Sequence, residues 1–339
     1  MVLKIVQVGL GAWGHTWAAS IVRSHKEVEL VACVDVIPAM LERAQKELSL
    51  APQQCFTSLP DALASVECDA VLITASLPGH VPAATTALQA GKHVLLEKPF
   101  APTLAEAQQL VALAEQQQRI LMISQNYRFH PAVQAVRTLL REQTLGPVGS
   151  VRIVFRKSRN SAPRESHSHY HIWQPLLADM SIHHFDLMRY VLGQEATHIF
   201  CQAWNPPWSN FDDPASAAAL ITFSGGTVVN YQGSWVSMEP QTSWGGRWHM
   251  ECAKGEIFWE SRGNDVPDRA TIRLLGGEAE DIPLPAMTQI DRHGSLSAFV
   301  EAIQSGKEPG SSGRDNLGTL ALMLAAIESS KSHTPLHLG

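Results

Sequence analysis

The glycines Gly9, Gly11 and Gly14 follow an apolar run at residues 3–8 and precede apolar residues at helical spacing. A strand that turns into a helix at such glycines can bind a dinucleotide. Gly9 permits the tight turn, Gly11 lets the pyrophosphate approach, and Gly14 lets the helix lie close to the strand. The N–H groups at the helix start would hold the phosphates. We therefore expect a nucleotide cofactor here.

A carboxylate strengthens this expectation. Asp35 ends the next apolar run, residues 28–34, and lies about 20 residues after Gly14, where an acidic residue binds the ribose hydroxyls. A carboxylate there would repel a 2′-phosphate, and no arginine immediately follows Asp35. The sequence therefore favours NAD over NADP.

Lys98 lies between Glu97 and Pro99, just after the apolar run at residues 93–96. Open α/β sheets bind ligands at the carboxyl ends of their strands, and Pro99 favours extended backbone at Lys98. Lys98 is therefore a candidate for the cofactor crevice. A solvated lysine in a surface loop would give the same local pattern.

A second group, Asp179, His183 and Asp186, has spacings of four and three residues. In a helix these side chains share one face, and polar groups on a packed helix need partners or a cleft. An ordinary Asp179–His183 helix pair explains the spacing as well as a site does. His184 lies about 100° further round the helix and is expected to serve packing.

Upstream, His167, His169 and His171 alternate and would line up on one side of an extended segment. Histidines with carboxylates can bind a metal, but the segment also suits a polar substrate loop. We adopt the substrate loop and expect no metal.

Basic residues precede this loop at Arg152, Arg156, Lys157, Arg159 and Arg164. Most such runs are solvated strand edges, but a part that faces a cleft would favour an anionic group on the substrate. Indole rings in the second half would pack in the core or stack on a sugar. They belong to Trp173, Trp204, Trp208, Trp235, Trp244, Trp248 and Trp259.

The elements that must position these residues change character along the chain. The first 125 residues alternate strand and helix signals, with strands expected at 3–8, 28–34, 70–74, 93–96 and 120–123. Ser58 with Asp61, and Thr103 with Glu106, resemble helix caps. This alternation predicts a doubly wound parallel sheet in a Rossmann domain spanning residues 1–125. The apolar stripe of its first helix would comprise Trp13, Trp17, Ala18, Ile21 and Val22.

Residues 126–339 predict an α+β domain with a large, mostly antiparallel open sheet. Its strands are expected at 148–155, 197–203, 217–223, 227–235, 249–252 and 271–275. Gly225 and Gly226 predict a hairpin. Helices are expected at 175–192, ended by Gly193, and at 316–330, where the closing helix would pack back on the first domain.

Composition limits the classes of function. A chain of 339 residues with 45% hydrophobic residues can build two domains. A formal charge of −6 gives no reason to expect nucleic acid. No apolar run is long enough to span a membrane, and the N-terminal strand does not read as a signal peptide. The five cysteines are odd in number and scattered, which indicates reduced thiols in a cytoplasmic protein.

Together the motifs resemble those of the Gfo/Idh/MocA oxidoreductases, the family of glucose-fructose oxidoreductase and inositol dehydrogenase. The resemblance rests on residues 9–14 (GLGAWG), 90–99 (AGKHVLLEKP), 126–129 (NYRF) and 179–186 (DMSIHHFD), and it spans nearly the whole chain. Ser181 departs from the family's usual glycine and would alter helix packing.

The resemblance implies that Lys98, Asp179 and His183 are catalytic. His183 would remove the proton of a substrate hydroxyl, Lys98 would stabilise the developing alkoxide, and Asp179 would orient the substrate or the histidine. The implied cofactor contacts are Gly9, Gly11, Ala12, Trp13, Gly14, Asp35, Thr74, Ser76, His80, Glu97, Lys98 and Asn126. The implied substrate contacts are Lys98, Tyr127, Arg128, Arg159, Arg164, His169, His171, Trp173, Asp179 and His183.

The implied activity is an NAD-dependent dehydrogenase acting on a sugar, a cyclic polyol or a derivative, including anionic ones. Two alternatives stay open. One is an NAD-dependent glycosidase that oxidises, eliminates and re-reduces its substrate. The other is a dinucleotide-binding member of the family without chemistry. The resemblance also implies a homodimer or homotetramer, with neither nucleic acid nor membrane as a partner.

Overall fold

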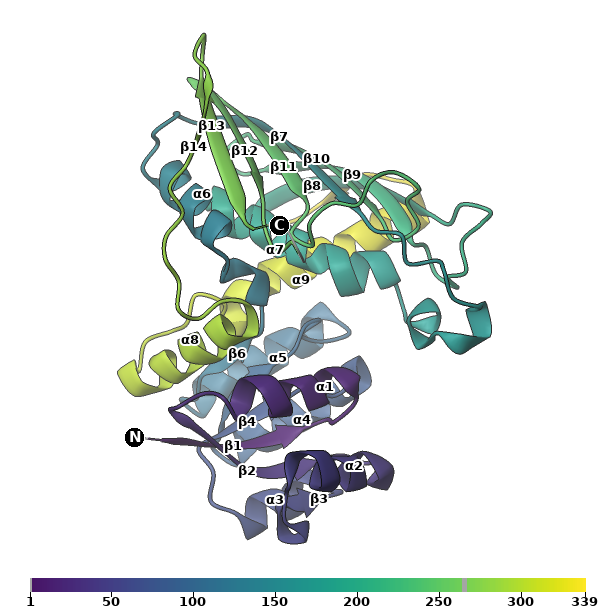
Figure 1. Cartoon of the computed structure of the whole chain (residues 1–339), viewed down its shortest axis with the longest axis vertical. Helices are drawn as coiled ribbons and strands as arrows, with labels where there is room; N and C mark the ends of the chain where they lie inside the picture. Colours follow the sequence, from purple (N-terminus) through teal and green to yellow (C-terminus); the bar gives the residue numbers. More distant parts are fainter. Residues whose placement is uncertain (1, 264–266) are drawn as a thin grey trace. The chain divides into compact units, whose positions relative to one another are not determined.

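The computed structural model describes residues 2–263 and 267–339 (Figure 1). The chain forms two compact units. One comprises Met1–Asn126 and Gln289–Leu317, and the other Tyr127–Thr288 and Gly318–Gly339. A single boundary after residue 125 therefore misplaces Gln289–Leu317, which returns to the first unit because α8 packs on β5 and on the helical turns that follow α1.

The first unit contains a six-stranded sheet in the order β3-β2-β1-β4-β5-β6, with every pairing parallel. Its strands are β1 (Leu3–Val8), β2 (Val28–Val34), β3 (Cys55–Phe56), β4 (Ala70–Ile73), β5 (His93–Leu96) and β6 (Leu121–Ile123). The strand order reverses between β1 and β4, which is where such sheets bind ligands. The predicted doubly wound sheet is confirmed.

The helices of the first unit are α1 (Ala12–Thr16), α2 (Pro38–Leu48), α3 (Leu59–Ser65), α4 (Leu77–Gln89), α5 (Leu104–Gln116), α8 (Asp291–Ser305) and the start of α9 (Gly313–Ser332). Those that follow the glycine turn and the caps at Ser58 and Thr103 begin where the sequence predicted. Ser58 and Thr103 cap α3 and α5 by accepting from the N–H groups of Asp61 and Glu106. Helix α8 was missed, because Gly294, Ser295 and Ser297 interrupt its apolar pattern.

The helix after the glycine turn differs from its prediction. α1 continues as π-helical turns over Trp17–Val22, so its register departs from 3.6 residues per turn. Trp17 is fully buried, but Trp13 is 43% exposed. The expected apolar stripe therefore includes Trp17 and excludes Trp13.

The second unit contains a nine-stranded sheet in the order β14-β13-β12-β11-β7-β10-β9-β8-β15. Its strands are β7 (Val148–Arg156), β8 (Ala196–Trp204), β9 (Ser216–Phe223), β10 (Val228–Ser234), β11 (Arg247–Cys252), β12 (Gly255–Glu260), β13 (Arg269–Leu274), β14 (Ala279–Asp281) and β15 (Leu336–His337). Among the strand pairings of the described residues of this sheet, only that of β7 with β10 is parallel, so the mostly antiparallel sheet is confirmed. The hairpin at Gly225 and Gly226 joins β9 to β10 as expected.

Helices α6 (Pro131–Arg141), α7 (Ile182–Leu192) and α9 lie on one face of this sheet (Figure 1). A π-helical segment, Pro175–Ser181, leads directly into α7. From Gly318 onward α9 clusters with this unit, and its Ser329 and Ser330 hydroxyls accept from β8 backbone N–H groups. The expectation that this helix packs back on the first domain stays a prediction. None of the described helices is long and apolar enough to cross a membrane.

Candidate active site

The glycine turn meets the steric demands of a dinucleotide site. Gly9 has φ +92°, and a Cβ there would lie 2.5 Å from the backbone nitrogen of Ala75. A Cβ on Gly14 would lie 2.0 Å from the carbonyl oxygen of Gly9, whereas a Cβ on Gly11 would meet nothing within 4 Å. The protein itself therefore excludes side chains at Gly9 and Gly14. At Gly11 the turn is open, as the approach of a pyrophosphate requires.

Two side chains brace this turn from inside. The Thr74 hydroxyl at the end of β4 donates to the Gly9 carbonyl at 2.7 Å. The Gln7 amide donates to the Gly14 carbonyl at 2.7 Å. Thr74, expected to contact the cofactor, thus has its hydroxyl engaged in holding the turn.

Asp35 holds the other side of the turn. Its carboxylate accepts from the N–H of Leu10 at 2.6 Å and from the N–H of Ile37 at 2.9 Å, and the residue is 8% exposed. Arg43 of α2 donates to the Leu10 carbonyl at 2.7 Å. The sequence did not identify Arg43 as part of this turn, because Arg43 comes from the following helix and not from the residues next to Asp35.

Lys98 follows β5 on a segment fixed by its neighbour. The Glu97 carboxylate accepts from the Trp17 indole N–H at 2.8 Å and from the Lys98 N–H at 3.2 Å. Glu97 is buried and Lys98 is half-buried. The Glu97 carboxylate therefore positions the backbone of Lys98.

His80 of α4 lies beneath the same segment. Its Nδ1 is 2.7 Å from the Pro99 carbonyl and its Nε2 is 2.9 Å from the Ala75 carbonyl. Burial lowers the pKa of His80. Both ring nitrogens face backbone carbonyls, so His80 braces the loops around Lys98 and Gly9; its expected role as a direct cofactor contact stays a prediction.

Of the remaining residues expected at the cofactor, three are exposed, and Asn126 is buried against α8. Ala12 and Ser76 are exposed. The Trp13 ring lies 4.2 Å from the Arg292 guanidinium carbon. Asn126 donates to the carboxylate of Asp291, which has a left-handed backbone at φ +54°. α8 thus supplies charged residues beside Trp13 and Asn126 that sequence reasoning missed.

In the second unit, His183 opens the first turn of α7 and is 6% exposed. Its imidazole stacks on the Tyr127 ring, with centroids 4.0 Å apart and planes 5° apart. The Tyr127 hydroxyl accepts from Arg262 at 3.0 Å. The stacking restricts the imidazole plane, which a positioned proton acceptor requires.

Asp179 lies in the π-helical segment and pairs with the loop that holds His167, His169 and His171. Its carboxylate is 3.3 Å from His169 Nε2. The π-helical turns change the spacing of Asp179, His183 and Asp186 around the helix axis. Their expected grouping on one face stays a prediction.

The neighbouring His184 serves packing, as expected. It is fully buried, with Nε2 3.0 Å from the Trp244 carbonyl and Nδ1 3.1 Å from the Tyr231 hydroxyl. Burial lowers its pKa to about 4. The Ser181 hydroxyl lies 2.8 Å from the same tyrosine oxygen. The serine that replaces the family's usual glycine thus joins a buried hydrogen-bond network.

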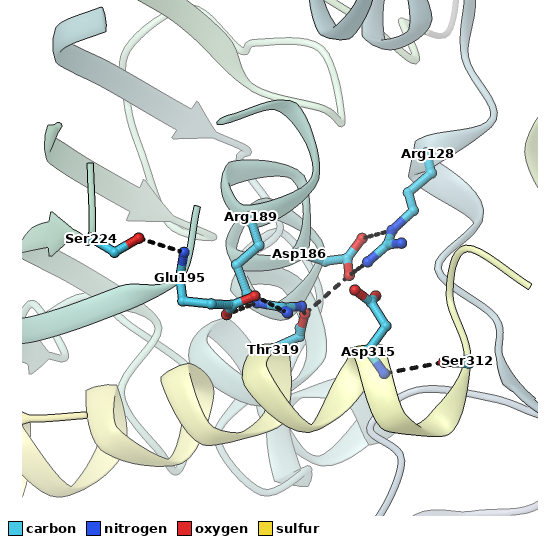
Figure 2. A network of polar contacts seen from close by, with 8 residues as sticks. All are labelled: Arg128, Asp186, Arg189, Glu195, Ser224, Ser312, Asp315 and Thr319. Carbon is cyan, nitrogen blue, oxygen red and sulfur yellow. Dashed lines mark hydrogen bonds and ion pairs between the residues drawn. The ribbon is translucent and has the colours of Figure 1, made fainter. Parts of the chain in front are cut away.

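A second network, buried at Arg128, Asp186 and Arg189 and exposed at Glu195, holds α7 (Figure 2). Arg128 donates to the Asp186 carboxylate at 2.7 and 2.6 Å, and Thr319 donates to it at 3.0 Å. Arg189 donates to Thr319 and, twice at 2.6 Å, to Glu195. The Arg128 guanidinium is thus engaged with Asp186, where a substrate contact had been expected.

The histidine loop forms short 3₁₀ turns where an extended strand was considered. His171 Nδ1 lies 2.7 Å from Asp212, which also pairs with Arg164. This hydrogen bond raises the pKa of His171 and lowers that of Asp212. His169 turns to Asp179 instead, and Trp173 is exposed. Within residues 2–263 and 267–339, no three His, Cys, Asp or Glu side chains are grouped to hold a metal ion.

Part of the basic run gathers near this half of the site. Lys157 Nζ and the guanidinium carbons of Arg159 and Arg262 lie 4.5, 5.3 and 5.8 Å from the Trp244 ring centroid. Only Arg159 had been expected at the substrate. Arg262 lies far along the chain, so no local pattern joined it to the others.

Comparison with known families gives two matches along the chain. Residues 3–125 match an oxidoreductase family with an NAD-binding Rossmann fold. Residues 133–258 match the GFO/IDH/MocA C-terminal domain.

Relatives of known name span nearly the whole chain. D-apiose dehydrogenase of Paraburkholderia graminis is 27% identical over 96% of this chain and 85% of its own length. Inositol 2-dehydrogenase of Rhizobium meliloti is 26% identical over 97% of each chain. The structure of an oxidoreductase from Agrobacterium radiobacter, in complex with NAD+, L-tartaric acid and magnesium, has a TM-score of 0.85 at 20% identity and covers 99% of this chain and 98% of its own.

Proposed function

Because this chain belongs to the Gfo/Idh/MocA family of oxidoreductases, we propose that it interconverts a hydroxyl and a carbonyl group of a sugar, a cyclic polyol or a derivative, with NAD as the hydride carrier. The observation that carries the proposal is the glycine turn, closed to side chains at Gly9 and Gly14 and open at Gly11. Its strand belongs to the same sheet as β5, which leads to Lys98. Relatives named as dehydrogenases of apiose and inositol support this class of substrate.

The residues of the turn suit NAD. Gly11 would admit the pyrophosphate, the N–H groups at the start of α1 would bind its oxygens, and the Asp35 carboxylate retains lone pairs for a ribose hydroxyl. The charge of Asp35 disfavours a 2′-phosphate. When bound, NAD supplies the nicotinamide carbon that exchanges hydride with the substrate.

In the proposed mechanism, His183 accepts the proton of the substrate hydroxyl as a hydride leaves the carbon that bears this hydroxyl. Stacking on Tyr127 keeps the imidazole in one plane. Lys98 donates a hydrogen bond to the reacting oxygen and stabilises its developing negative charge. Asp179, which pairs with His169, orients the substrate. For the reverse direction, the proton returns from His183 to the oxygen.

The assay that tests this proposal mixes the protein with NAD+ or NADP+ and a panel of polyols and sugars, and follows NADH or NADPH formation. We expect net NADH formation with at least one free polyol or sugar, and a higher kcat/KM with NAD+ than with NADP+. Cleavage of a chromogenic glycoside without net NADH would instead establish a glycosidase as the principal activity. The absence of both would favour a non-catalytic dinucleotide-binding protein.

We also propose that the protein acts in a reducing compartment such as the cytoplasm. All five cysteines are free thiols. Cys33 and Cys55 are paired neighbours on β2 and β3 yet form no disulfide. Burial raises the pKa of Cys33 to about 12, which keeps its thiol protonated and unreactive.

A further inference from the structure

The basic cluster formed by Lys157, Arg159 and Arg262 surrounds one indole in the second unit. The Trp244 ring has these three cations within 4.5, 5.3 and 5.8 Å of its centroid. The face of an indole attracts cations, so Trp244 holds the positive groups together. The cluster draws on the end of β7 and on the segment after β12, which are distant in sequence.

Side chains along β7 point alternately to the two faces of the sheet. This alternation separates Lys157 and Arg159 from Arg152 and Arg156. Arg152 donates to His249 at 2.8 Å, and Arg156 pairs with Glu239. Lys157 is instead an even number of residues from the buried Ile153 and Phe155, so it shares their face of the sheet. The interstrand contacts continue past the end of β7, because Arg159 donates its N–H to the Trp235 carbonyl at 2.8 Å. Strand geometry therefore separates Arg152 and Arg156, which bind His249 and Glu239, from the residues of the cluster.

The burial and the pKa of Lys157 show that the concentration of positive charge in the cluster is unfavourable. Its residue is only 5% exposed, and its ammonium donates to the Thr242 carbonyl at 2.7 Å. Burial lowers the pKa of Lys157, and the positive charges of Arg159 and Arg262 lower it further. Placing like charges close together at a partly desolvated site is unfavourable. A bound anion would reverse that electrostatic penalty.

The cluster is linked to the proposed base through direct contacts. The Arg262 guanidinium carbon lies 4.5 Å from the Tyr127 ring centroid, and that ring stacks on His183. On the other side, the Trp244 carbonyl accepts from His184 at 3.0 Å. Consecutive residues of α7 thus contact the ring of Tyr127 and the backbone of Trp244. A sugar with its reacting hydroxyl at His183 would have other substituents within reach of these cations.

We propose that the basic cluster is a subsite for an anionic substituent of the sugar substrate, a carboxylate or a phosphate. The proposal rests on the proposed function, because it names the substrate class of that site. The planar guanidinium groups of Arg159 and Arg262 suit two-oxygen contacts with such an anion. The buried ammonium of Lys157 adds a fixed positive charge. The indole of Trp244 aligns all three.

The test compares matched sugars that differ by one carboxylate: D-glucuronate with D-glucose, and D-galacturonate with D-galactose. Arg159→Gln is the test variant, because Arg159 is exposed and its loss is expected to leave the fold intact. Arg152→Gln is the matched control, since Arg152 is an exposed arginine of β7 that pairs with His249. Steady-state NADH formation gives the ratio of kcat/KM for acid over neutral sugar. Calorimetric titration of the protein, with and without NADH, measures binding of D-glucuronate, D-glucose and inorganic phosphate independently of turnover.

We expect the wild-type protein to favour the acid of each pair, and Arg159→Gln to lower that preference and the affinity for glucuronate by about tenfold, the usual effect of losing one charge-assisted hydrogen bond. Arg152→Gln should leave both ratios as in the wild type. Binding of phosphate in place of glucuronate would identify a phosphorylated sugar as the source of the anion.

The outcomes separate this proposal from the proposed function. Turnover of neutral sugars with no preference for acids, and no calorimetric difference between the two variants, would overturn the subsite and leave the dehydrogenase standing. Glucuronate or phosphate binding that only Arg159→Gln weakens, without turnover of any sugar, would support the subsite and overturn the proposed activity.

Discussion

His183 and His184 are neighbours in the chain, but their surroundings give them different tasks. His183 stacks on Tyr127 at the start of α7, whereas His184 is fully buried between Tyr231 and the Trp244 carbonyl. A carbonyl can only accept, so Nε2 of His184 carries the proton and Nδ1 accepts from the tyrosine. The neutral imidazole satisfies both contacts.

The low pKa of His184 predicts an acid-sensitive fold. Burial lowers the pKa of His184, and of His93, to about 4 from the ordinary 6.5. As the pH falls below about 6.5, these histidines bind protons in the unfolded chain but stay neutral in the folded chain. The free energy of unfolding therefore decreases between that pH and about 4. Urea unfolding across this range should show a shallower pH dependence for His184→Gln than for the wild type.

The matched control for this pH dependence is His333→Gln, because His333 is exposed. It should follow the wild-type curve. Equal slopes for His184→Gln and the wild type would show that His184 is not held neutral by the fold.

Sequence reasoning identified individual residues well where a local motif dictates their place. The glycine turn, Asp35 and the packing role of His184 follow from spacing alone. The partners of Arg128 and Lys157 could not be predicted from spacing, because Asp186 and Trp244 come from distant parts of the chain. Thr74 and Glu97 were placed correctly at strand ends, but their hydrogen bonds inside the protein depend on three-dimensional packing.

At the scale of elements, the helix that carries His183 depends on one buried ion pair. The side chains of Arg128 and Asp186 are 4% and 1% exposed, and they bind through two hydrogen bonds (Figure 2). Asp186→Asn would remove the charge of Asp186 from this buried pair and weaken both charge-assisted hydrogen bonds. We expect the free energy of unfolding, measured in urea, to fall by about 3–5 kcal/mol.

Arg269→Gln is the control for this ion pair. Arg269 and Asp281 form a pair in which the side chains are 61% and 72% exposed, so its loss should cost less than about 1 kcal/mol. A similar loss for both variants would contradict the structural role assigned to the Arg128–Asp186 pair.

Periodicity predicted most of the strands and helices but missed others, among them the regular helix α6. The parallel strands of the first unit and the hairpin at Gly225 and Gly226 have strong local signals. The π-helical segment Pro175–Ser181 resembles an ordinary helix in sequence. Strand β12 was missed because Glu256 and Glu260 place charge within an otherwise apolar strand, where pairing with β11 and β13 decides the conformation.

At the scale of the whole molecule, the outer face of the large sheet differs from end to end. Across β7, β11 and β12 it carries Arg152, His249 and Glu256 in a hydrogen-bonded row. Across β8 and β9 it exposes Phe200 and Leu220, which are register partners. Exposed apolar side chains that adjoin one another are typical of interfaces.

We therefore expect a homodimer or homotetramer that uses the β8–β9 face. Light scattering coupled to size exclusion should give a multiple of the 37.1 kDa chain mass, and Phe200→Glu should shift it toward the monomer. Leu275→Glu, at a residue 90% exposed on the turn after β13, should leave the mass unchanged. A monomeric wild-type protein would contradict this expectation.

The two-domain plan was predictable because the strand–helix alternation stops near residue 125. The return of Gln289–Leu317 to the first unit was not, because only tertiary contacts reveal it. This return brings Asp291 and Arg292 to the first unit, next to Asn126 and Trp13.

The central claim is that His183 and Lys98 carry out proton transfer and charge stabilisation in an NAD-linked oxidation. The most direct test measures NADH formation by the wild type, His183→Gln and Lys98→Met with the best substrate, alongside NADH binding by each. We expect kcat to fall by about 10²–10⁴-fold in each variant, while the affinity for NADH stays within about threefold, as expected of residues that act on substrate oxygen. Turnover by both variants at the wild-type rate would contradict the account.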